Sequence, residues 1–293
     1  MLRPLESVPN FSEGRDRATI DALAGALGSR ARLLDVHADA DHNRSVFTLV
    51  GSEDELVEAL VAGVSCAVER IDLRRHEGVH PRVGAADVVP LVPIVPEDAP
   101  RARDAARVLA ERVGTELELP VFLYGELGGG RGPAYFRRGG PEELQQRIER
   151  GELAPDFGPS SLTAGAGGVL VGMRTPLIAF NVNLRGSLEA AREVAAVVRE
   201  TGGGFRGVRA LGLDLPSAGL VQVSMNVEDW EAAALHEIVA RVEQEAATRG
   251  AEVAGSELVG LMPAGAAAAA AGAALRIDGF DAARVLELRL LDD

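Results

Sequence analysis

The segment that most limits the possible folds is Ala86–Val95, which reads ADVVPLVPIV. Nearly all of its residues are apolar, and such runs are typical of strands that are buried on both faces of a sheet. A helical pattern precedes it, where Ser52 and Glu55 form a capping box ahead of an apolar stripe. A second helical pattern, Ala99–Glu116, follows it. A buried strand flanked by amphipathic helices indicates an α/β protein.

The other patterns repeat one order of elements. In the first half, strands are predicted at Leu2–Val8, Arg32–His37, Ser45–Val50, Ala86–Val95 and Val121–Tyr124, with helices at Arg15–Leu27, after Ser52 and at Ala99–Glu116. In the second half, strand runs within Val169–Val182 precede a helix at Ser187–Glu200, strands at Val208–Leu213 and Leu220–Val227, and a helix at Glu231–Arg249. The order strand, helix, strand, strand, helix, strand is the split βαβ plan. The length of 293 residues suits two domains. We therefore predict an α/β (α+β) fold of two split-βαβ, ferredoxin-like subdomains, residues 1–175 and 176–293, packed with a ligand cleft between them.

The stretch Ala154–Gly172, APDFGPSSLTAGAGGVLVG, is rich in Gly, Pro and Ser and marks the predicted junction. Two interpretations remain open. It is either a flexible linker or a loop that holds a ligand between the two halves. Composition alone favours the linker.

The charge of the chain limits its partners. The net charge is −14, and all 30 basic residues are Arg. An acidic surface argues against nucleic acid and against anionic membranes, because both require a positive field. Small anions can still bind where arginines gather.

Cysteine and hydropathy patterns bear on the compartment. The lone Cys66 excludes an internal disulfide and is expected to be a buried, inert thiol. The N-terminus lacks the apolar segment of a secretory signal, and Pro263 interrupts the apolar run Leu261–Ile277. We expect a soluble cytoplasmic protein.

The stretch RHEGVHPRVG, residues 75–84, contains H-E-x-x-H, which in zinc proteases places two histidines on one helix face. Here Gly78 lies inside the motif and Pro81 follows its second histidine. Because a proline disfavours the helical conformation of the residue before it, His80 is not expected to be helical. We predict no metal site, and a zinc hydrolase is the least favoured function.

Several motifs together resemble glutamate formiminotransferase. In chain order they are VPNFSEG at Val8–Gly14, NR at Asn43–Arg44, HPRVGAADV at His80–Val88, YGE at Tyr124–Glu126, APDFGPSS at Ala154–Ser161, IAFNVNL at Ile178–Leu184 and GSELVGLMP at Gly255–Pro263. They run in order over nearly the full chain, so their joint specificity is much higher than that of any one alone.

The resemblance implies a function. Members transfer the formimino group of N-formimino-L-glutamate to N5 of tetrahydrofolate, giving 5-formiminotetrahydrofolate and L-glutamate, in histidine degradation and one-carbon metabolism. It implies two α/β subdomains with the tetrahydrofolate co-substrate between them, a homodimer, and His80 as the catalytic residue. The folate-contacting loop corresponds to Gly158, Pro159, Ser160, Ser161, Leu162, Thr163, Ala164, Gly165, Ala166 and Gly167. Because the chain stops at Asp293, a separate cyclodeaminase is expected to take the product.

The reaction is an amidine exchange, in which one proton leaves N5 and one reaches the departing glutamate nitrogen. An imidazole can do both in turn, so His80 is expected to act as base and then acid. His76 is expected to be structural or a partner of His80. The lower-ranked assignments are Arg82 and Arg44 for substrate carboxylates, His37 and Asp39 for orienting His80, and Glu126 or Asp87 for the pterin.

This chain departs from the bifunctional members in three places. Ser7 replaces a cysteine, His37 replaces a carboxylate, and the loop Leu162–Gly167 lacks a tryptophan. Two further functions therefore stay open besides the leading one. They are a related folate-dependent formyl- or formiminotransferase with another donor, and a folate-binding protein without catalysis.

Overall fold

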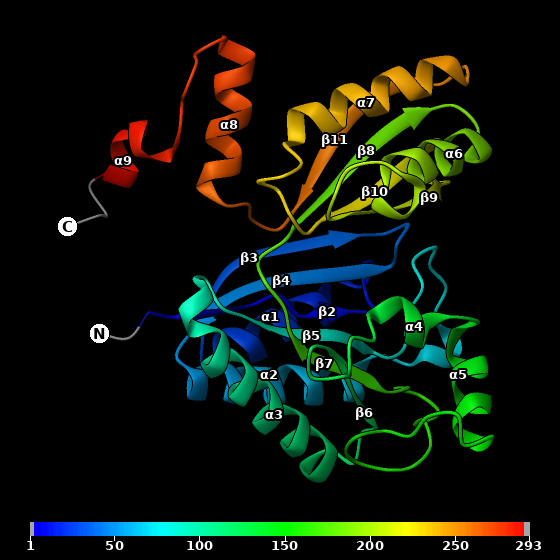
Figure 1. Cartoon of the computed structure of the whole chain (residues 1–293). Coiled ribbons are helices and arrows are strands. Elements are labelled where there is room, and N and C mark those ends of the chain that lie inside the picture. Colours follow the sequence, from blue (N-terminus) through cyan, green and yellow to red (C-terminus); the bar gives the residue numbers. More distant parts are fainter. Residues whose placement is uncertain (1–2, 290–293) are drawn as a thin grey trace. The chain divides into compact units, whose positions relative to one another are not determined.

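The apolar run that begins at Ala86 forms strand β5 (Ala86–Val92), in which every residue is buried. It lies inside a seven-stranded sheet with the order β1-β4-β2-β5-β7-β6, in which β3 also pairs with β4. The computed structural model describes residues 3–289 (Figure 1). Its contacts divide the chain into two compact units, Met1–Pro176 and Leu177–Asp293.

The first unit starts with the predicted split βαβ plan. Its elements are β1 (Leu5–Ser7), β2 (Asn10–Phe11), α1 (Arg17–Gly28), β3 (Arg32–Asp39), β4 (Arg44–Gly51), α2 (Glu53–Arg70) and β5. The strands β1 to β5 pair antiparallel. A second section follows, made of α3 (Ala99–Glu116), β6 (Val121–Gly125), α4 (Pro133–Arg137), α5 (Gly140–Glu149) and β7 (Val169–Met173). Here β7 joins β5 and β6 in parallel, which extends the sheet.

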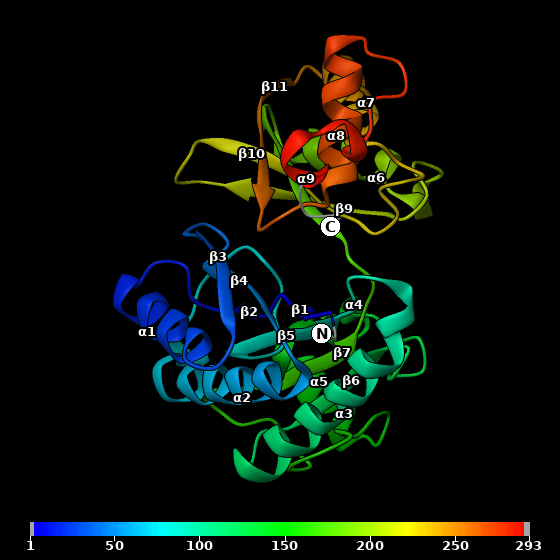
Figure 2. The ribbon, with the colours of Figure 1, turned by 90° about the vertical axis from the view of Figure 1, so that its left-hand side faces the viewer.

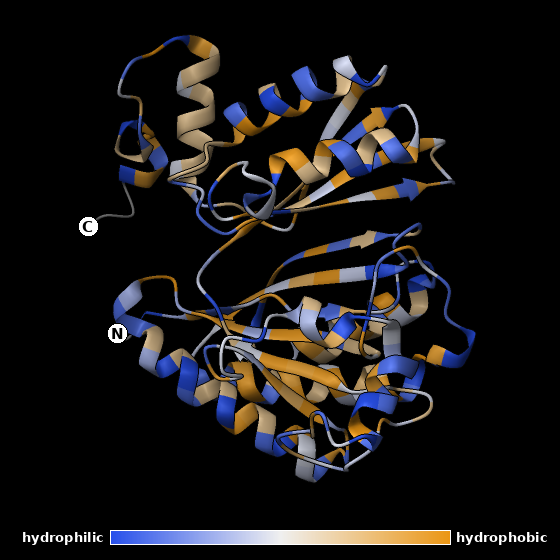
Figure 3. Ribbon diagram, turned by 45° about the vertical axis from the view of Figure 1, so that its right-hand side comes forward, coloured by the Kyte–Doolittle hydropathy of each residue, from blue (hydrophilic) through white to orange (hydrophobic). Residues whose placement is uncertain are grey.

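Helices α1, α2 and α3 cover one face of this sheet (Figure 2). The capping box of Ser52 and Glu55 is present at the start of α2. The helices pack Leu23, Leu60 and Leu109 against the alternate apolar residues of the strands. In Figure 3 the inner strands of the first unit are the most hydrophobic segments, as expected for a sheet covered by helices.

The other face of the sheet carries a smaller apolar cluster. Phe122 and Tyr124 of β6 alternate with Val121, which faces the helices, so they point to the opposite side. Phe136 of α4 and Leu144 of α5 pack against them. This cluster fixes α4 and α5 over the β5–β7–β6 end of the sheet. It thereby positions Arg137, the residue after Phe136.

The second unit has the ferredoxin-like topology. Its elements are β8 (Ile178–Arg185), α6 (Leu188–Val198), β9 (Val208–Leu215), β10 (Leu220–Val227), α7 (Leu235–Thr248) and β11 (Glu252–Val259), followed by α8 (Ala264–Leu275) and α9 (Leu286–Arg289). The strands pair antiparallel in the order β11-β8-β10-β9. The prediction of a mixed α/β fold with two sheets is confirmed.

Several predicted elements need correction. The first strand is two short strands, because Pro9 interrupts the ladder, and Leu2 lies outside the described residues. The run Val169–Val182 is two strands that join different sheets. The helix predicted from Glu231 begins at Leu235. The elements β11, α4, α5 and α8 were not predicted from the sequence.

The Gly/Pro-rich stretch of residues 154–172 is part of the first unit, so the linker interpretation is wrong for it. Asp156 N–H donates to the Val121 carbonyl at 2.8 Å, and Val121 N–H donates to the Phe157 carbonyl at 3.0 Å. The contact boundary between the units comes later, after Pro176.

Cys66, expected to be buried, lies on α2 and is half-buried. Desolvation raises the pKa of its thiol.

Among the helices of residues 3–289, none is both long enough and apolar enough to cross a membrane.

The loop that ends in β5 packs closely on the Gly-rich loop before β7. Gly84 forms a β-bridge with Gly167. A Cβ built on Gly84 would lie 1.7 Å from the carbonyl oxygen of Gly168, which is backbone and cannot swing away. The contact therefore requires glycine at this position.

We expect Gly84→Ala to lower the free energy of unfolding by roughly 1–3 kcal/mol, the usual effect of overpacking a fixed site. Gly165→Ala is the matched control, because its Cβ would meet nothing closer than Asp72 Oδ1 at 3.6 Å. The control should change stability by less than about 1 kcal/mol. Urea titrations followed by circular dichroism measure both, and equal effects would contradict the packing argument.

Candidate functional site

The histidine-rich loop between α2 and β5 is not helical. A short 3₁₀ turn, Leu73–Arg75, ends at His76, whose backbone is extended, and His80 also lies outside any helix. The two histidines of H-E-x-x-H therefore do not share a helix face, as predicted from Gly78 and Pro81. Within residues 3–289, no group of three or more His, Cys, Asp or Glu side chains is arranged to hold a metal ion.

Arg82 holds the loop in shape from inside. Its Nη2 donates to the carbonyl oxygens of Gly78 at 2.7 Å and of His80 at 2.8 Å. Its Nη1 contacts Nδ1 of His76, whose Nε2 lies 3.0 Å from the carbonyl oxygen of Asn43. Because that carbonyl can only accept, Nε2 of His76 carries the proton and Nδ1 accepts from Arg82. Both nitrogens of His76 are thus used by the protein.

A buried carboxylate, Asp87, lies beneath this loop. Its Oδ1 accepts the backbone N–H of Val83 at 2.7 Å. Its Oδ2 accepts Nη1 of Arg44 at 2.6 Å and also Nη2 of Arg137, from the end of α4. Burial alone would raise the pKa of Asp87, but the two guanidinium groups and the hydrogen bonds hold the pKa well below its usual range. Asp87 is therefore ionised, with its oxygens already occupied.

Arg44 is fully engaged by the protein. Besides the bond to Asp87, its Nε and Nη2 donate to Oδ1 of Asn10 at 3.1 and 2.9 Å. Burial lowers the pKa of Arg44 to about 10, so it remains charged at neutral pH. Its role in the structure is to tie β2, β4 and β5 together. Arg44 and Arg82, the two arginines expected to meet substrate carboxylates, both donate to protein acceptors.

His80 is half-buried and has one nitrogen fixed. Its Nδ1 lies 2.8 Å from the carbonyl oxygen of Pro81, so Nδ1 carries the proton in the neutral ring. The lone pair is then on Nε2. Burial is the main reason that the pKa of His80 is lowered, and the charges of Arg44 and Arg137 add to the effect. The neutral base is therefore the form of His80 at neutral pH.

His42, in the turn between β3 and β4, lies beside His80. The two ring centroids are 5.8 Å apart, with the ring planes 32° from parallel. Only 8% of His42 is exposed, and its Nε2 is buried with no hydrogen-bond partner among the described residues. The sequence suggested no role for His42, and the structure makes it the ring neighbour of His80.

The other predicted residues lie in different places. His37 is on β3 opposite Val46. Asp39 Oδ1 accepts the backbone N–H of His42 at 2.7 Å, so it shapes the turn that carries His42. Glu126 is exposed and forms an ion pair with Arg103 of α3 at 2.8 Å. The structure thus brings Asp39 near the histidine pair through His42, and it directs Glu126 towards α3.

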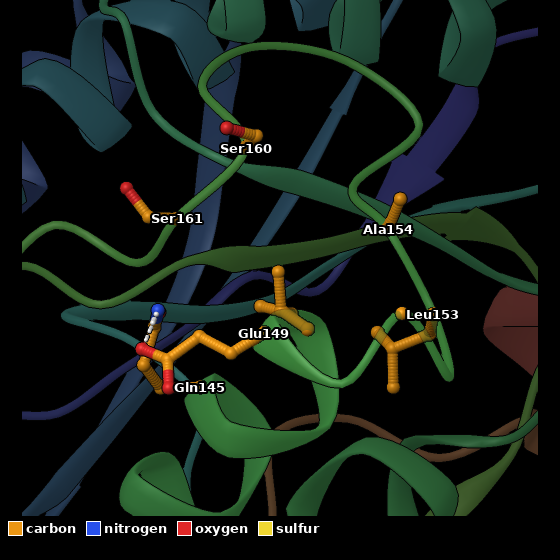
Figure 4. A pocket seen from close by; sticks show the side chains of 8 residues that line it. Gln145, Glu149, Leu153, Ala154, Ser160 and Ser161 are labelled. Atoms are coloured by element: carbon orange, nitrogen blue, oxygen red, sulfur yellow. Dashed lines mark hydrogen bonds between the residues drawn. The ribbon is translucent and has the colours of Figure 1, made fainter.

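The predicted folate loop borders an open pocket of about 640 Å³ in the first unit (Figure 4). The pocket is lined by Ser160 and Ser161 of the loop and by Gln145 and Glu149 of α5, among others. The loop is tied to the histidine loop, because Ala85 N–H donates to the carbonyl of Ala166 at 2.8 Å.

Comparison with known proteins agrees with the motifs. A profile described as the formiminotransferase domain, N-terminal subdomain, matches residues 4–174, and one described as the formiminotransferase domain matches residues 179–278. The chain belongs to the formiminotransferase family. The resemblance read from the sequence is confirmed.

Three relatives show how much of the chain the family likeness covers. A glutamate formimidoyltransferase of Streptococcus pyogenes serotype M1 is 38% identical, over 99% of this chain and 100% of the relative. One of Thermoplasma acidophilum is 38% identical, over 98% and 97%. A formimidoyltransferase-cyclodeaminase of the rat is 38% identical over 90% of this chain, which spans 51% of that relative.

Sequence reasoning missed four residues of this candidate site. Besides His42, these are Asn10 and Tyr124, which stand in quoted motifs without an assigned role, and Arg137, which was not singled out. The available signal for Arg137 was the run Phe136-Arg137-Arg138, two adjacent arginines in an acidic chain. Its contact with Asp87 spans 50 positions and follows from the fold alone.

Asp87→Asn should be strongly destabilising, because it leaves Arg44 and Arg137 buried without their counter-ion. We expect a loss of about 3–5 kcal/mol in the free energy of unfolding. The folded-state pKa of Asp87 is depressed, so its contribution is present above the unfolded value, about 3.9, and is lost as the pH falls through the lower folded value. The stability gap between parent and variant should stay constant near neutrality and shrink only below about pH 4.

The matched control is Asp72→Asn, which breaks an exposed ion pair with Arg74. It should change stability far less, since exposed ion pairs contribute little. Urea midpoints across pH 3–8 measure both variants, and a similar loss for each would contradict a central role for Asp87.

Proposed function

We propose that this chain is a glutamate formimidoyltransferase, which moves the formimino group of N-formimino-L-glutamate to N5 of tetrahydrofolate. The observation that carries the proposal is His80, a neutral imidazole whose Nδ1 is bonded to a backbone carbonyl and whose Nε2 bears the lone pair. It stands in a family framework that two named glutamate formimidoyltransferases share over nearly their whole length. Folate is the co-substrate that this family implies.

The reaction needs a proton carrier and no change of oxidation state. N5 of tetrahydrofolate attacks the formimino carbon, and a tetrahedral intermediate forms. Nε2 of His80 takes the proton from N5 and then gives it to the glutamate nitrogen as the carbon–nitrogen bond to glutamate breaks. The new N5–carbon bond remains, so atoms and protons balance. An imidazole can make both transfers because its ordinary pKa is close to neutrality. In the free protein, burial and the charges of Arg44 and Arg137 lower the pKa of His80 below that value.

The surroundings of His80 support this role. The bond to Pro81 fixes the tautomer and the ring direction, which a proton carrier requires. Arg44 and Arg137 disfavour the imidazolium in the free protein. An anionic substrate would offset these charges, so His80 would accept a proton more readily once the donor is bound.

The predicted folate loop, residues 158–167, is the part of the proposal that rests on resemblance and position. Its first residues, Gly158 to Ser161, are exposed, and Ser160 and Ser161 offer hydroxyls to a ligand. Near its end, the carbonyl of Ala166 accepts the N–H of Ala85, in the segment that follows His80. A homodimer and a separate cyclodeaminase for the product also remain proposals that rest on resemblance.

His80→Asn should lower kcat by about 10²–10⁴-fold, the usual contribution of general acid–base catalysis, while folate affinity is kept. Asn cannot carry a proton at neutral pH. His76→Asn is the control, because both nitrogens of His76 are bonded within the loop and its effect on kcat should be smaller. Initial rates with formiminoglutamate and tetrahydrofolate decide the matter. A His80→Asn enzyme with near-parental kcat would show that another group carries the proton.

The pH profile adds an independent check. The pKa of His80 is lowered in the free protein, so the rising limb of kcat/KM should lie below pH 6.5, the ordinary value, rather than at neutrality. That limb should be absent in His80→Asn.

Folinate, a product analogue, should protect residues 158–167 from hydrogen exchange, because a bound ligand would cover exposed backbone of this loop. Mass spectrometry of peptides from the loop measures the protection. The exposed turn at Ser217–Gly219, in the second unit, is the internal control and should not change. Equal exchange of the loop with and without saturating folinate would place the folate elsewhere.

A further inference from the structure

The arginine at the end of α4 has unused hydrogen-bonding capacity in the histidine site. Arg137 Nη2 donates to Asp87, while its Nε is buried and has no hydrogen-bond partner among the described residues. The Nε atoms of Arg103, Arg147 and Arg199 are also buried without a hydrogen-bond partner among the described residues. The free Nε of Arg137 therefore points to a ligand only together with the charge balance around Asp87, because the lost hydration of such a nitrogen is expensive. Arg44 differs, because each of its three guanidinium nitrogens donates a hydrogen bond to Asp87 or Asn10.

The charge balance around Asp87 is also incomplete. Two guanidinium groups contact this single carboxylate, and the salt bridge with Arg44 alone would neutralise it. Arg137 therefore adds a positive charge, with its side chain only 15% exposed, in a chain whose net charge is −14. Surplus positive charge in a largely buried place is a feature of anion sites.

A second unpaired donor lies on the same face of the sheet as α4. The hydroxyl of Tyr124 is buried and has no partner in the described residues, and only 5% of the residue is exposed. A Cβ on Gly172 would lie 2.8 Å from the Tyr124 ring, so the ring leans over β7 in the direction of β5, which carries Asp87. Phe136, next to Arg137, packs in the same cluster as Tyr124.

We propose that Arg137 and the Tyr124 hydroxyl bind a carboxylate of the formimino donor, beside His80. Guanidinium offers a carboxylate two parallel donors, and a phenol adds a third. The inference rests on the proposed function, and it assigns a carboxylate of formiminoglutamate to residues other than Arg44 and Arg82. All three guanidinium nitrogens of Arg44, and both Nη atoms of Arg82, already contact protein groups.

Formiminoglutamate, the formimino donor, fits the site of Arg137 and Tyr124 better than the glutamate tail of folate does. In formiminoglutamate, the carboxylates and the reacting carbon belong to one small molecule, so an anion site beside the catalytic histidine is within their reach. In tetrahydrofolate, the p-aminobenzoyl group separates the glutamate tail from N5. Asp87 connects the proposed carboxylate site with the loop of His80. It accepts the N–H of Val83, three residues after His80, and it also binds Arg137.

The test compares Arg137→Met, Tyr124→Phe and the control Arg138→Met, which removes an exposed arginine next to the site. Each is assayed with formiminoglutamate and with its two monoamides, in which one carboxylate is neutral. We expect Arg137→Met to raise KM for the diacid about 10- to 100-fold, the value of a charge-assisted pair, with kcat changed only a few-fold. Tyr124→Phe should raise KM several-fold, and Arg138→Met should match the parent.

The monoamides show which carboxylate of formiminoglutamate Arg137 contacts. The parent should prefer the diacid to one of the monoamides, and Arg137→Met should lose that preference while folinate affinity stays parental. An unchanged KM in Arg137→Met, or a preference that survives the substitution, would overturn the assignment while leaving the transferase intact. If Arg137→Met does not give a native circular dichroism spectrum, Tyr124→Phe, which deletes a single oxygen, takes its place under the same criteria.

Calorimetric binding of L-glutamate separates this inference from the proposed function. Parental binding that is lost in Arg137→Met supports the carboxylate site even if the parent transfers no formimino group. Equal binding by both proteins contradicts the site even if the parent is an active transferase.

Discussion

The site depends on one ionic interaction, the contact of buried Asp87 with Arg44 and Arg137. A lone carboxylate in this place would be too costly to keep ionised, and the arginines would be equally costly without it. Together they connect β4, β5 and α4, and Oδ1 of Asp87 also holds the backbone at Val83. The loop of His80 is therefore anchored at its end by the same carboxylate that positions both cations.

Close backbone packing completes the anchoring of this loop. Gly84 lies against the carbonyl of Gly168, and Gly78 lies so close to the turn of His42 that its Cβ would be 2.4 Å from the His42 carbonyl oxygen. Arg82 fills the inside of the loop. Two segments that are distant from this loop in the sequence, the turn of His42 and the backbone at Gly168, are thus fixed against it, and the loop holds the ring of His80 with Nε2 available. A proton carrier needs such rigid support, because small displacements reduce the rate strongly.

The distribution of arginines explains how an acidic chain can bind anionic substrates. Many arginines form ion pairs at the surface, such as Arg112 with Glu58 and Glu116. Near His80 the balance is reversed, and the cations outnumber the carboxylate that they contact. A local excess of positive charge within an acidic surface favours small dicarboxylates over large polyanions, since nucleic acids need an extended positive field.

The sequence by itself determined the local features. Alternating apolar patterns identified most strands and helices, the capping box fixed the start of α2, and Gly78 with Pro81 argued against a helical zinc motif. Ordered motifs identified the family and pointed to His80. These features depend on neighbouring residues or on short spacings, which a sequence displays directly.

Only the tertiary structure decided which side chains meet. Asp87 finds Arg44 across 43 positions and Arg137 across 50, and His42 lies beside His80 through the pairing of β3 with β4. The sequence favoured Arg44 and Arg82 as ligands of substrate carboxylates and did not single out Arg137. In the fold all three donate to protein acceptors, and Arg137 also keeps a buried Nε without a partner among the described residues. Whether an arginine stabilises the protein or is left to bind a ligand depends on its acceptors, and long-range chain topology decides which acceptors it meets.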